Sequence, residues 1–389
     1  MLGVILGAGA SYDSFEDVPA PRPPDPEPPV DLRSTGLAIH LDRPDLDLGL
    51  DIERLPLANQ LFDGRESFSS VIEQYPEVRS VAARLKRTTN LEAELDLIAE
   101  EGADDPQVGR QLVAMRFYLR SVIALAQTSL ANETHGVDNY HTLLDEIRKW
   151  QLQTGSEVCL ITFNYDTLLE DACVDSFAEF GQPIDLDWYM ESHPKIRVYK
   201  PHGSITWEQE VTSTSRTDAA SLINHGWDLQ PGDQFHYGRP GPKPRNSPLW
   251  GLPLLPALAL PYQAKPNQFV MPPQHKQMLE QDLSNMTTVL IVGWRATEQH
   301  FLELWQRNKP ERVVGFIVNG ADHTSDAAAK NLRLARCLDE AIPEDMGFSE
   351  FVSTRAFNIA FPRTRQLPTR LLIRSGTHAA YQLWTGQTS

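Results

Sequence analysis

Short, wholly apolar runs alternate with longer amphipathic stretches along this chain. Runs of this length, bounded by turn residues, are typical of strands covered on both faces, as in a parallel sheet. The expected strands are Leu2–Leu6, Glu157–Phe163, Arg197–Tyr199, Thr288–Gly293 and Arg312–Asn319. Because helical patterns separate these runs, the sequence predicts an α/β fold: a Rossmann-like parallel sheet with helices on both faces.

The longest helical pattern lies between about residues 67 and 130. Leu91, Leu95 and Ile98 fall at helical spacing there, and residues 111–127 repeat apolar side chains at i, i+3, i+4 and i+7. This block predicts a helical insertion or subdomain. Further helices are expected at Asp138–Leu152, Asp166–Phe177, Glu298–Arg307 and Ala327–Ala341.

Other stretches predict loops. The proline-dense segment Pro19–Pro29 excludes a helix and predicts an extended surface loop, either a connector or a lid over the end of the first strand. Residues 211–246 are polar and rich in glycine and proline, which predicts a long loop, and a hairpin is expected near Leu371–Ile373. We expect one domain over residues 1–320, with residues 321–389 as a C-terminal extension packed on it.

Charge and cysteine content narrow the function classes. The 389 residues carry 52 acidic and 35 basic side chains, a net charge of −17, which argues against direct nucleic-acid binding. The three cysteines form no C-x-x-C pair, so neither a four-cysteine zinc site nor a disulfide framework is expected. The first residues lack a basic leader region, and prolines interrupt the apolar stretch Trp250–Tyr262. We therefore expect a cytoplasmic protein with no membrane segment and no metal.

Candidate chemistry lies at the ends of the predicted strands, because ligands bind outside the carboxyl ends of strands in open parallel sheets. The first strand is followed by Gly7-Ala8-Gly9-Ala10-Ser11, whose glycines would let backbone N–H groups approach a phosphate. Tyr12 replaces the third glycine of the dinucleotide fingerprint, and the acidic residue expected at the end of a second strand, about 20 positions further on, is not evident because that region is proline-rich. By itself this segment is compatible with phosphate binding or with a plain turn.

Two further strand ends carry an amide and an imidazole. Thr162-Phe-Asn-Tyr-Asp166 offers Asp166 as a helix N-cap, which leaves Asn164 as a second cap or a ligand contact. In Lys200-Pro-His-Gly-Ser204, His202 sits in a turn constrained by proline and glycine. It is either a general base with a pKa near neutrality or a turn histidine with satisfied hydrogen bonds.

The fourth strand end reads Val292-Gly-Trp-Arg-Ala-Thr-Glu298. Gly293 would allow close approach of a ligand, and Glu298 would reach a ribose hydroxyl. Alternatively, Thr297 caps the next helix and Glu298 favours its positive end.

Together, and in this order, these four motifs resemble the SIR2-like family, the sirtuin-related NAD-binding fold, and in particular its bacterial anti-phage defence branch. The resemblance covers roughly residues 2–320 and implies an NAD+ glycohydrolase that cleaves the nicotinamide–ribose bond. It implies that Asn164 positions the attacking water and a ribose hydroxyl, and that His202 is the catalytic base. It also implies an NAD+-binding set in which the glycine turn holds the diphosphate and Asp166 supports the nicotinamide–ribose end. That set comprises Gly7, Ala8, Gly9, Ala10, Ser11, Asp166, Gly203, Ser204, Gly293 and Glu298.

The chain departs from the sirtuin deacetylases of this family, which carry a zinc module with paired C-x-x-C motifs. Its absence favours NAD+ cleavage over deacylation. Nicotinamide leaves as a neutral base, so the reaction needs a dry ribose pocket and a placed water more than it needs a metal. An NAD-dependent protein deacylase or ADP-ribosyl transferase, and a non-catalytic subunit that senses NAD or ADP-ribose, remain alternatives. The resemblance further implies a separately encoded helicase, ATPase or Argonaute-type partner. Because an unrestrained NAD+ hydrolase would deplete the cell's cofactor, we expect control by homo-oligomerisation or by such a partner.

Overall fold

The computed structural model describes most of the chain. The described residues are 1–14, 54–57, 60–62, 65–88, 90–133, 138–177, 184–190, 195–213, 221–238, 241, 243–248, 251–260, 269–320 and 323–362. The segment Pro19–Pro29 and the hairpin expected near Leu371–Ile373 lie outside these residues.

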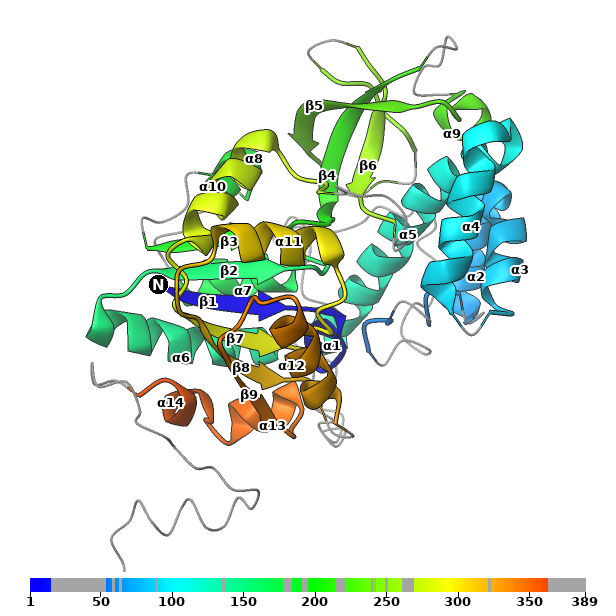
Figure 1. The fold of residues 1–389 in the computed structure, drawn as a ribbon. Coiled ribbons are helices and arrows are strands. Elements are labelled where there is room, and N and C mark those ends of the chain that lie inside the picture. Colours follow the sequence, from blue (N-terminus) through cyan, green and yellow to red (C-terminus); the bar gives the residue numbers. More distant parts are fainter. Residues whose placement is uncertain are drawn as a thin grey trace, which may run out of the picture.

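The main sheet has six parallel strands in the order β3-β2-β1-β7-β8-β9 (Figure 1). Numbered along the chain, this is the doubly wound order 3-2-1-4-5-6, and it confirms the Rossmann-like α/β fold. The strands are β1 (Leu2–Leu6), β2 (Val158–Thr162), β3 (Ile196–Tyr199), β7 (Thr288–Val292), β8 (Val314–Val318) and β9 (Glu340–Glu344). Because strand order reverses on either side of β1, the point between β1 and β7 is where such sheets bind ligands.

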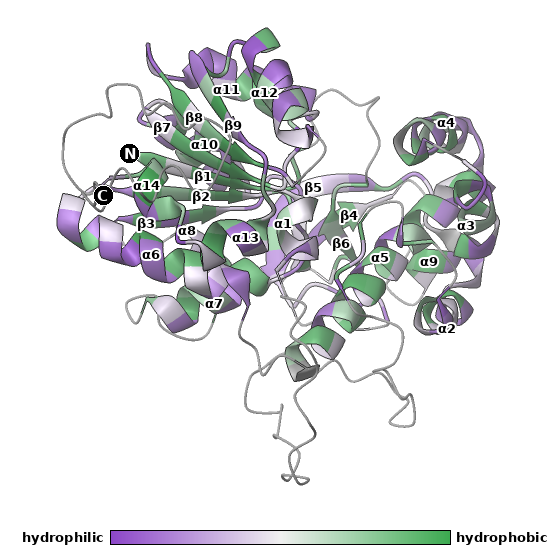
Figure 2. Ribbon diagram, turned by 90° about the horizontal axis from the view of Figure 1, so that it is seen from below, coloured by the Kyte–Doolittle hydropathy of each residue, from purple (hydrophilic) through white to green (hydrophobic). Residues whose placement is uncertain are grey.

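Helices cover both faces of this sheet. On one face α6 (Asn139–Thr154) packs against α7 (Leu168–Ser176), α13 (Phe348–Ser353) and α14 (Phe357–Ala360). The other face carries α10 (Pro273–Leu283), α11 (Gln299–Asn308) and α12 (Thr324–Leu334) (Figure 2). The inner strands are apolar along their whole length, as expected for a sheet buried on both sides.

A second unit lies at the carboxyl edge of the main sheet (Figure 1). Its helical part confirms the predicted block and comprises α2 (Glu66–Gln74), η3 (Pro76–Val78), α3 (Arg79–Leu85), α4 (Leu91–Asp104) and α5 (Pro106–Glu133). The long helix α5 packs on an antiparallel sheet of order β5-β4-β6. The strands of that sheet are β4 (Gly203–Thr212), β5 (Gln230–Tyr237) and β6 (Leu254–Leu258). The remaining helices of the described chain are short: α1 (Ala8–Tyr12), α8 (Leu186–Met190) and α9 (Leu222–His225).

Two predicted elements are wrong. The expected loop over residues 211–246 contains the end of β4, helix α9 and strand β5. The expected helix Ala327–Ala341 ends at Leu334, because Arg336 takes a left-handed conformation (φ 56°), and the chain then forms β9 beside β8. The residues assigned to a C-terminal extension therefore contribute the sixth strand, while the proposed boundary at residue 320 stays a prediction.

Candidate functional site

The glycine turn after β1 packs directly on the end of β7. The N–H of Gly7 donates to the Val292 carbonyl (2.9 Å), and the N–H of Gly9 donates to the Gly293 carbonyl (3.0 Å). Gly293 has a φ of 63°, and a Cβ there would overlap the backbone nitrogen of Ala10. The sequence thus brings Gly7–Ser11 and Gly293 together at the switch point of the sheet.

Asn164 follows β2 and faces the same turn. Its side-chain nitrogen Nδ2 lies 2.9 Å from the Gly7 carbonyl oxygen, 2.7 Å from Ser11 Oγ and 3.1 Å from Tyr140 Oη. The residue is 6% exposed. Since Nδ2 is committed to the protein, the carbonyl oxygen Oδ1 is the group left for a ligand.

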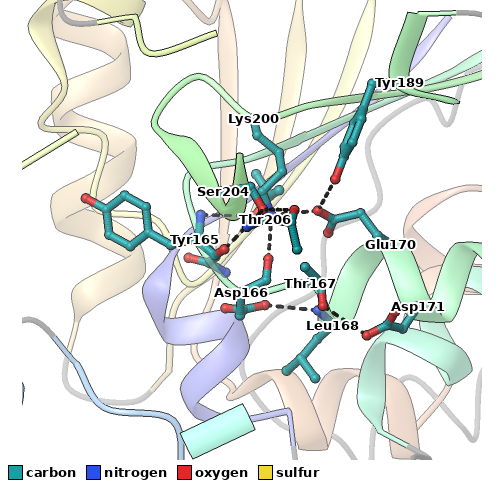
Figure 3. A network of polar contacts seen from close by, with 12 residues as sticks. Tyr165, Asp166, Thr167, Leu168, Glu170, Asp171, Tyr189, Lys200, Ser204 and Thr206 are labelled. Carbon is teal, nitrogen blue, oxygen red and sulfur yellow. Dashed lines mark hydrogen bonds and ion pairs between the residues drawn. The ribbon is translucent and has the colours of Figure 1, made fainter. Parts of the chain in front are cut away.

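A buried polar network fixes the loop after β2, which begins next to Asn164 in the sequence (Figure 3). Lys200 Nζ donates to the backbone carbonyl of Asp166 and pairs with Glu170 Oε1 at 2.9 Å, and both Lys200 and Glu170 are fully buried. The Asp166 carboxylate accepts from the N–H of Leu168 (3.2 Å), the capping bond foreseen for it, although Thr167 is the N-cap residue of α7. Burial raises the pKa of the Asp166 carboxyl, and the nearby Lys200 ammonium opposes that rise.

His202 lies in the tight turn between β3 and β4. Its ring is edge-on to Phe163 (centroids 4.9 Å) and 5.5 Å from the ring of His300 on α11. Burial, with a smaller effect of His300, lowers the pKa of His202 to about 3, so the imidazole is neutral near pH 7. Gly203 makes the turn possible, because its φ is 83° and a Cβ there would overlap the Ala257 carbonyl oxygen.

The segment that contains most of these residues is similar to a known protein family. Residues 158–314 match the family model of the SIR2-like domain. This match supports the SIR2-like resemblance for the segment that contains Asn164, His202 and Gly293, whereas the glycine turn precedes it. A comparison with curated proteins finds no match to the chain.

Other residues expected to bind NAD+ have protein partners within the matched segment. Ser204 is fully buried, with its hydroxyl 3.0 Å from Thr206 Oγ1. Glu298 Oε2 accepts from Trp294 Nε1 (2.6 Å) and from the N–H of Thr297 (3.0 Å). Glu298 is also the N-cap residue of α11, so Thr297 does not cap this helix.

Aromatic rings join separate strand ends within the matched segment. Trp294, after β7, stacks on Phe163 with centroids 4.9 Å apart and planes at 12°. Phe163 in turn contacts His202. A continuous row of rings therefore runs from Trp294, which bonds Glu298, through Phe163 to His202. Phe163 directly precedes Asn164 in the sequence.

Sequence reasoning missed Tyr140 and His300. Tyr140, on α6, is fully buried against Ser11 and Asn164, and nothing in its local sequence distinguishes it from a core tyrosine. His300 Nε2 is buried without a hydrogen-bond partner in the described part of the chain. His300 belongs with the site residues because its ring lies 5.5 Å from that of His202.

The described residues contain no group of three or more His, Cys, Asp or Glu side chains arranged to hold a metal ion. The cysteines Cys159, Cys173 and Cys337 are free and buried. None of the helices in the described ranges combines the length and low polarity that a membrane crossing requires.

Proposed function

We propose that this protein hydrolyses NAD+ at the bond between nicotinamide and ribose. The observation that supports this proposal most directly is the arrangement of Asn164 and His202. The Asn164 amide is fixed beside the switch point so that Oδ1 is left for a ligand, and the neutral imidazole of His202 lies next to Phe163. The match to the SIR2-like domain supports NAD+ as the ligand, because SIR2-like domains bind NAD+.

In this reaction the C1′–N bond breaks and nicotinamide leaves with the bonding electron pair as a neutral base. A water oxygen bonds to C1′ and gives up a proton, so the products are nicotinamide and ADP-ribose. We assign Asn164 Oδ1 to accept a hydrogen bond from that water and the neutral His202 to take the proton. Burial keeps this imidazole neutral, the state that a base requires, and it also lowers the imidazole's affinity for the proton, in contrast to the near-neutral pKa expected from the sequence.

The remaining contacts follow from where each residue lies. We propose that Gly7, Ala8, Gly9, Ala10 and Ser11 pass beneath the diphosphate at the switch point and that Asp166 supports the ribose end from the loop after β2. Gly293 and Gly203 shape the site by letting neighbouring backbone pack closely, and we assign neither a hydrogen bond to NAD+. Ser204 and Glu298 shape the pocket through Thr206 and Trp294.

The proposal predicts that Asn164→Ala and His202→Ala each lower NAD+ cleavage by at least ~100-fold, as expected when a positioning or acid–base group is lost. Both residues lie at the edge of the core, so melting temperatures should stay near that of the wild type. The measurement is release of nicotinamide and ADP-ribose from NAD+ by purified protein. The matched control is Asn308→Ala on α11, which should keep full activity. The side-chain amide of Asn308 donates to the Leu304 carbonyl of the same helix.

Near wild-type turnover in either site variant would contradict the assignment. Adding an acylated peptide to the same assay separates the alternatives: O-acyl-ADP-ribose would indicate a deacylase, and ADP-ribose attached to protein a transferase. A role in defence against phage, with activity gated by assembly or a partner, follows from the family resemblance and stays a prediction.

A further inference from the structure

Tyr140 enters the site from a helix that none of the four motifs includes. Its helix α6 begins with a capping box, in which Asp138 accepts from the backbone of Tyr140 and His141. The Tyr140 hydroxyl lies 2.8 Å from Ser11 Oγ and 3.1 Å from Asn164 Nδ2. These contacts join residues 129 and 24 positions apart in the sequence.

The hydrogen bonds of the Asn164 side chain determine which way its amide is turned. Asn164 Nδ2 carries two hydrogens, and one of them must go to the Gly7 carbonyl, which can only accept. The other is shared between the oxygens of Ser11 and Tyr140. The Ser11 hydroxyl also bonds the Asp166 carboxylate, which can only accept, so the Tyr140 hydroxyl donates to Ser11 Oγ and both oxygens are left as acceptors toward Asn164. Turning the amide over would set its oxygen against the Gly7 carbonyl and lose the donor to the two hydroxyls. The three acceptors together therefore select one orientation of the amide.

We propose that Tyr140 is a positioning residue, which with Ser11 holds the Asn164 amide so that Oδ1 faces the substrate water. This inference rests on the proposed hydrolysis of NAD+ and deepens it. It also gives Ser11 a second task, since the same hydroxyl that lies under the expected diphosphate fixes Asn164.

The ring of Tyr140 is held independently of its hydroxyl. Phe348 on α13 packs edge-on against it (centroids 5.6 Å), and Ser349 Oγ bonds Asp13. Asn139, the neighbour of Tyr140, donates its N–H to the Ser14 carbonyl at 2.8 Å. A phenylalanine at position 140 should therefore occupy the same place. Burial raises the pKa of Tyr140 well above its usual value, so the hydroxyl stays protonated across the working pH range.

The test is Tyr140→Phe, measured by kcat and KM for NAD+ and by melting temperature. Losing the hydroxyl that bonds both Asn164 and Ser11 should lower kcat about 5- to 10-fold and leave KM nearly unchanged. The change should also vanish in the Asn164→Ala background, because Tyr140 acts only through Asn164. The matched control is Tyr118→Phe, which removes the hydroxyl of another buried tyrosine, bonded to the Leu61 carbonyl in the helical block. It should leave kcat unchanged.

The outcomes separate the two proposals. Wild-type protein that leaves NAD+ intact overturns the proposed function and this inference with it. Wild-type protein that cleaves NAD+, with a Tyr140→Phe variant of equal kcat, overturns only the inference. So does an equal loss of kcat in the wild-type and Asn164→Ala backgrounds, because the hydroxyl would then act by another route.

Discussion

At the end of β7, Gly293 has a backbone conformation that residues with a side chain disfavour, and its surroundings leave no room for a side chain. Gly293 combines a φ of 63° with a position at which a Cβ would overlap the Gly9–Ala10 backbone. We predict that Gly293→Ala lowers the free energy of unfolding by more than about 2 kcal/mol, through backbone strain and overpacking together. Denaturant unfolding measures this change.

The control for this prediction is Gly320→Ala. Gly320 follows β8 with a φ of 87°, but a Cβ there would have no atom within 4 Å. Its loss of stability should be limited to the backbone term of about 1 kcal/mol. Equal losses in the two variants would show that the contact between the strand ends adds nothing.

The buried imidazole of His202 predicts a pH dependence. Its folded pKa of about 3 lies below the unfolded value of 6.5, so the unfolded chain takes up a proton first as pH falls. This group therefore removes stability as pH drops from about 6.5 towards 3, and it adds no pH dependence above that window. The base stays neutral throughout, so NAD+ cleavage should hold its rate into mildly acidic solution.

His300 supplies the test of that explanation. It lowers the pKa of His202 in addition to burial, so His300→Asn should raise that pKa and move the acidic limb of the kcat/KM profile to higher pH. The measurement is the pH profile of both proteins. A limb that moves to lower pH, or does not move, would exclude electrostatic coupling between the two rings.

Among the elements, β3, β4, α7 and α8 meet at one buried ion pair. Lys200 pairs with Glu170 on α7, whose Oε1 also accepts from Tyr189 on α8 (2.8 Å) (Figure 3). Glu170 Oε2 has no partner among the described residues. Lys200→Met would leave a buried carboxylate without its cation, so we predict a loss of about 3–5 kcal/mol of stability.

Changing both partners distinguishes this cause from loss of packing. Lys200→Met combined with Glu170→Leu removes both charges, and it should recover most of the stability lost in the single variant. Urea unfolding of the three proteins gives the comparison. A double variant no more stable than Lys200→Met would show that the pair contributes through shape and not through charge.

Five of the six strands of the main sheet could be predicted, because short apolar runs mark them in the sequence. The sixth, β9, could not, because it carries charged residues at both ends and is only partly buried. The second sheet could not, because β4 carries Glu208 and Glu210 in the interior. Their charges are met by Arg120 on α5 (2.7 Å from Glu208) and by His236 on β5 (2.9 Å from Glu210). Such partners come from distant parts of the chain, so the sequence around β4 does not show that its glutamates are buried. Strand β5 lies within the expected loop 211–246 and none of its residues is buried, so no apolar run marks it.

The same reasoning separates the predicted from the unpredicted parts of the site. Asn164 and His202 stand directly after apolar strands, and parallel topology brings such positions to one edge. Tyr140 reaches that edge through the packing of α6 beneath the sheet. Its position depends on the geometry of the whole fold, and no local pattern records it.

For the molecule as a whole, β1 sits at the centre of the sheet, between β2 and β7. The residues that flank it on the β7 side, Thr288–Val292, follow it by more than 280 positions. At translation rates of 5–20 residues per second, roughly 15–55 s separate synthesis of the two strands. During that interval the nascent chain holds an apolar strand with at least one unpaired edge. Maturation of this protein should therefore be slow and depend on chaperones that shield hydrophobic segments until β7 has been made.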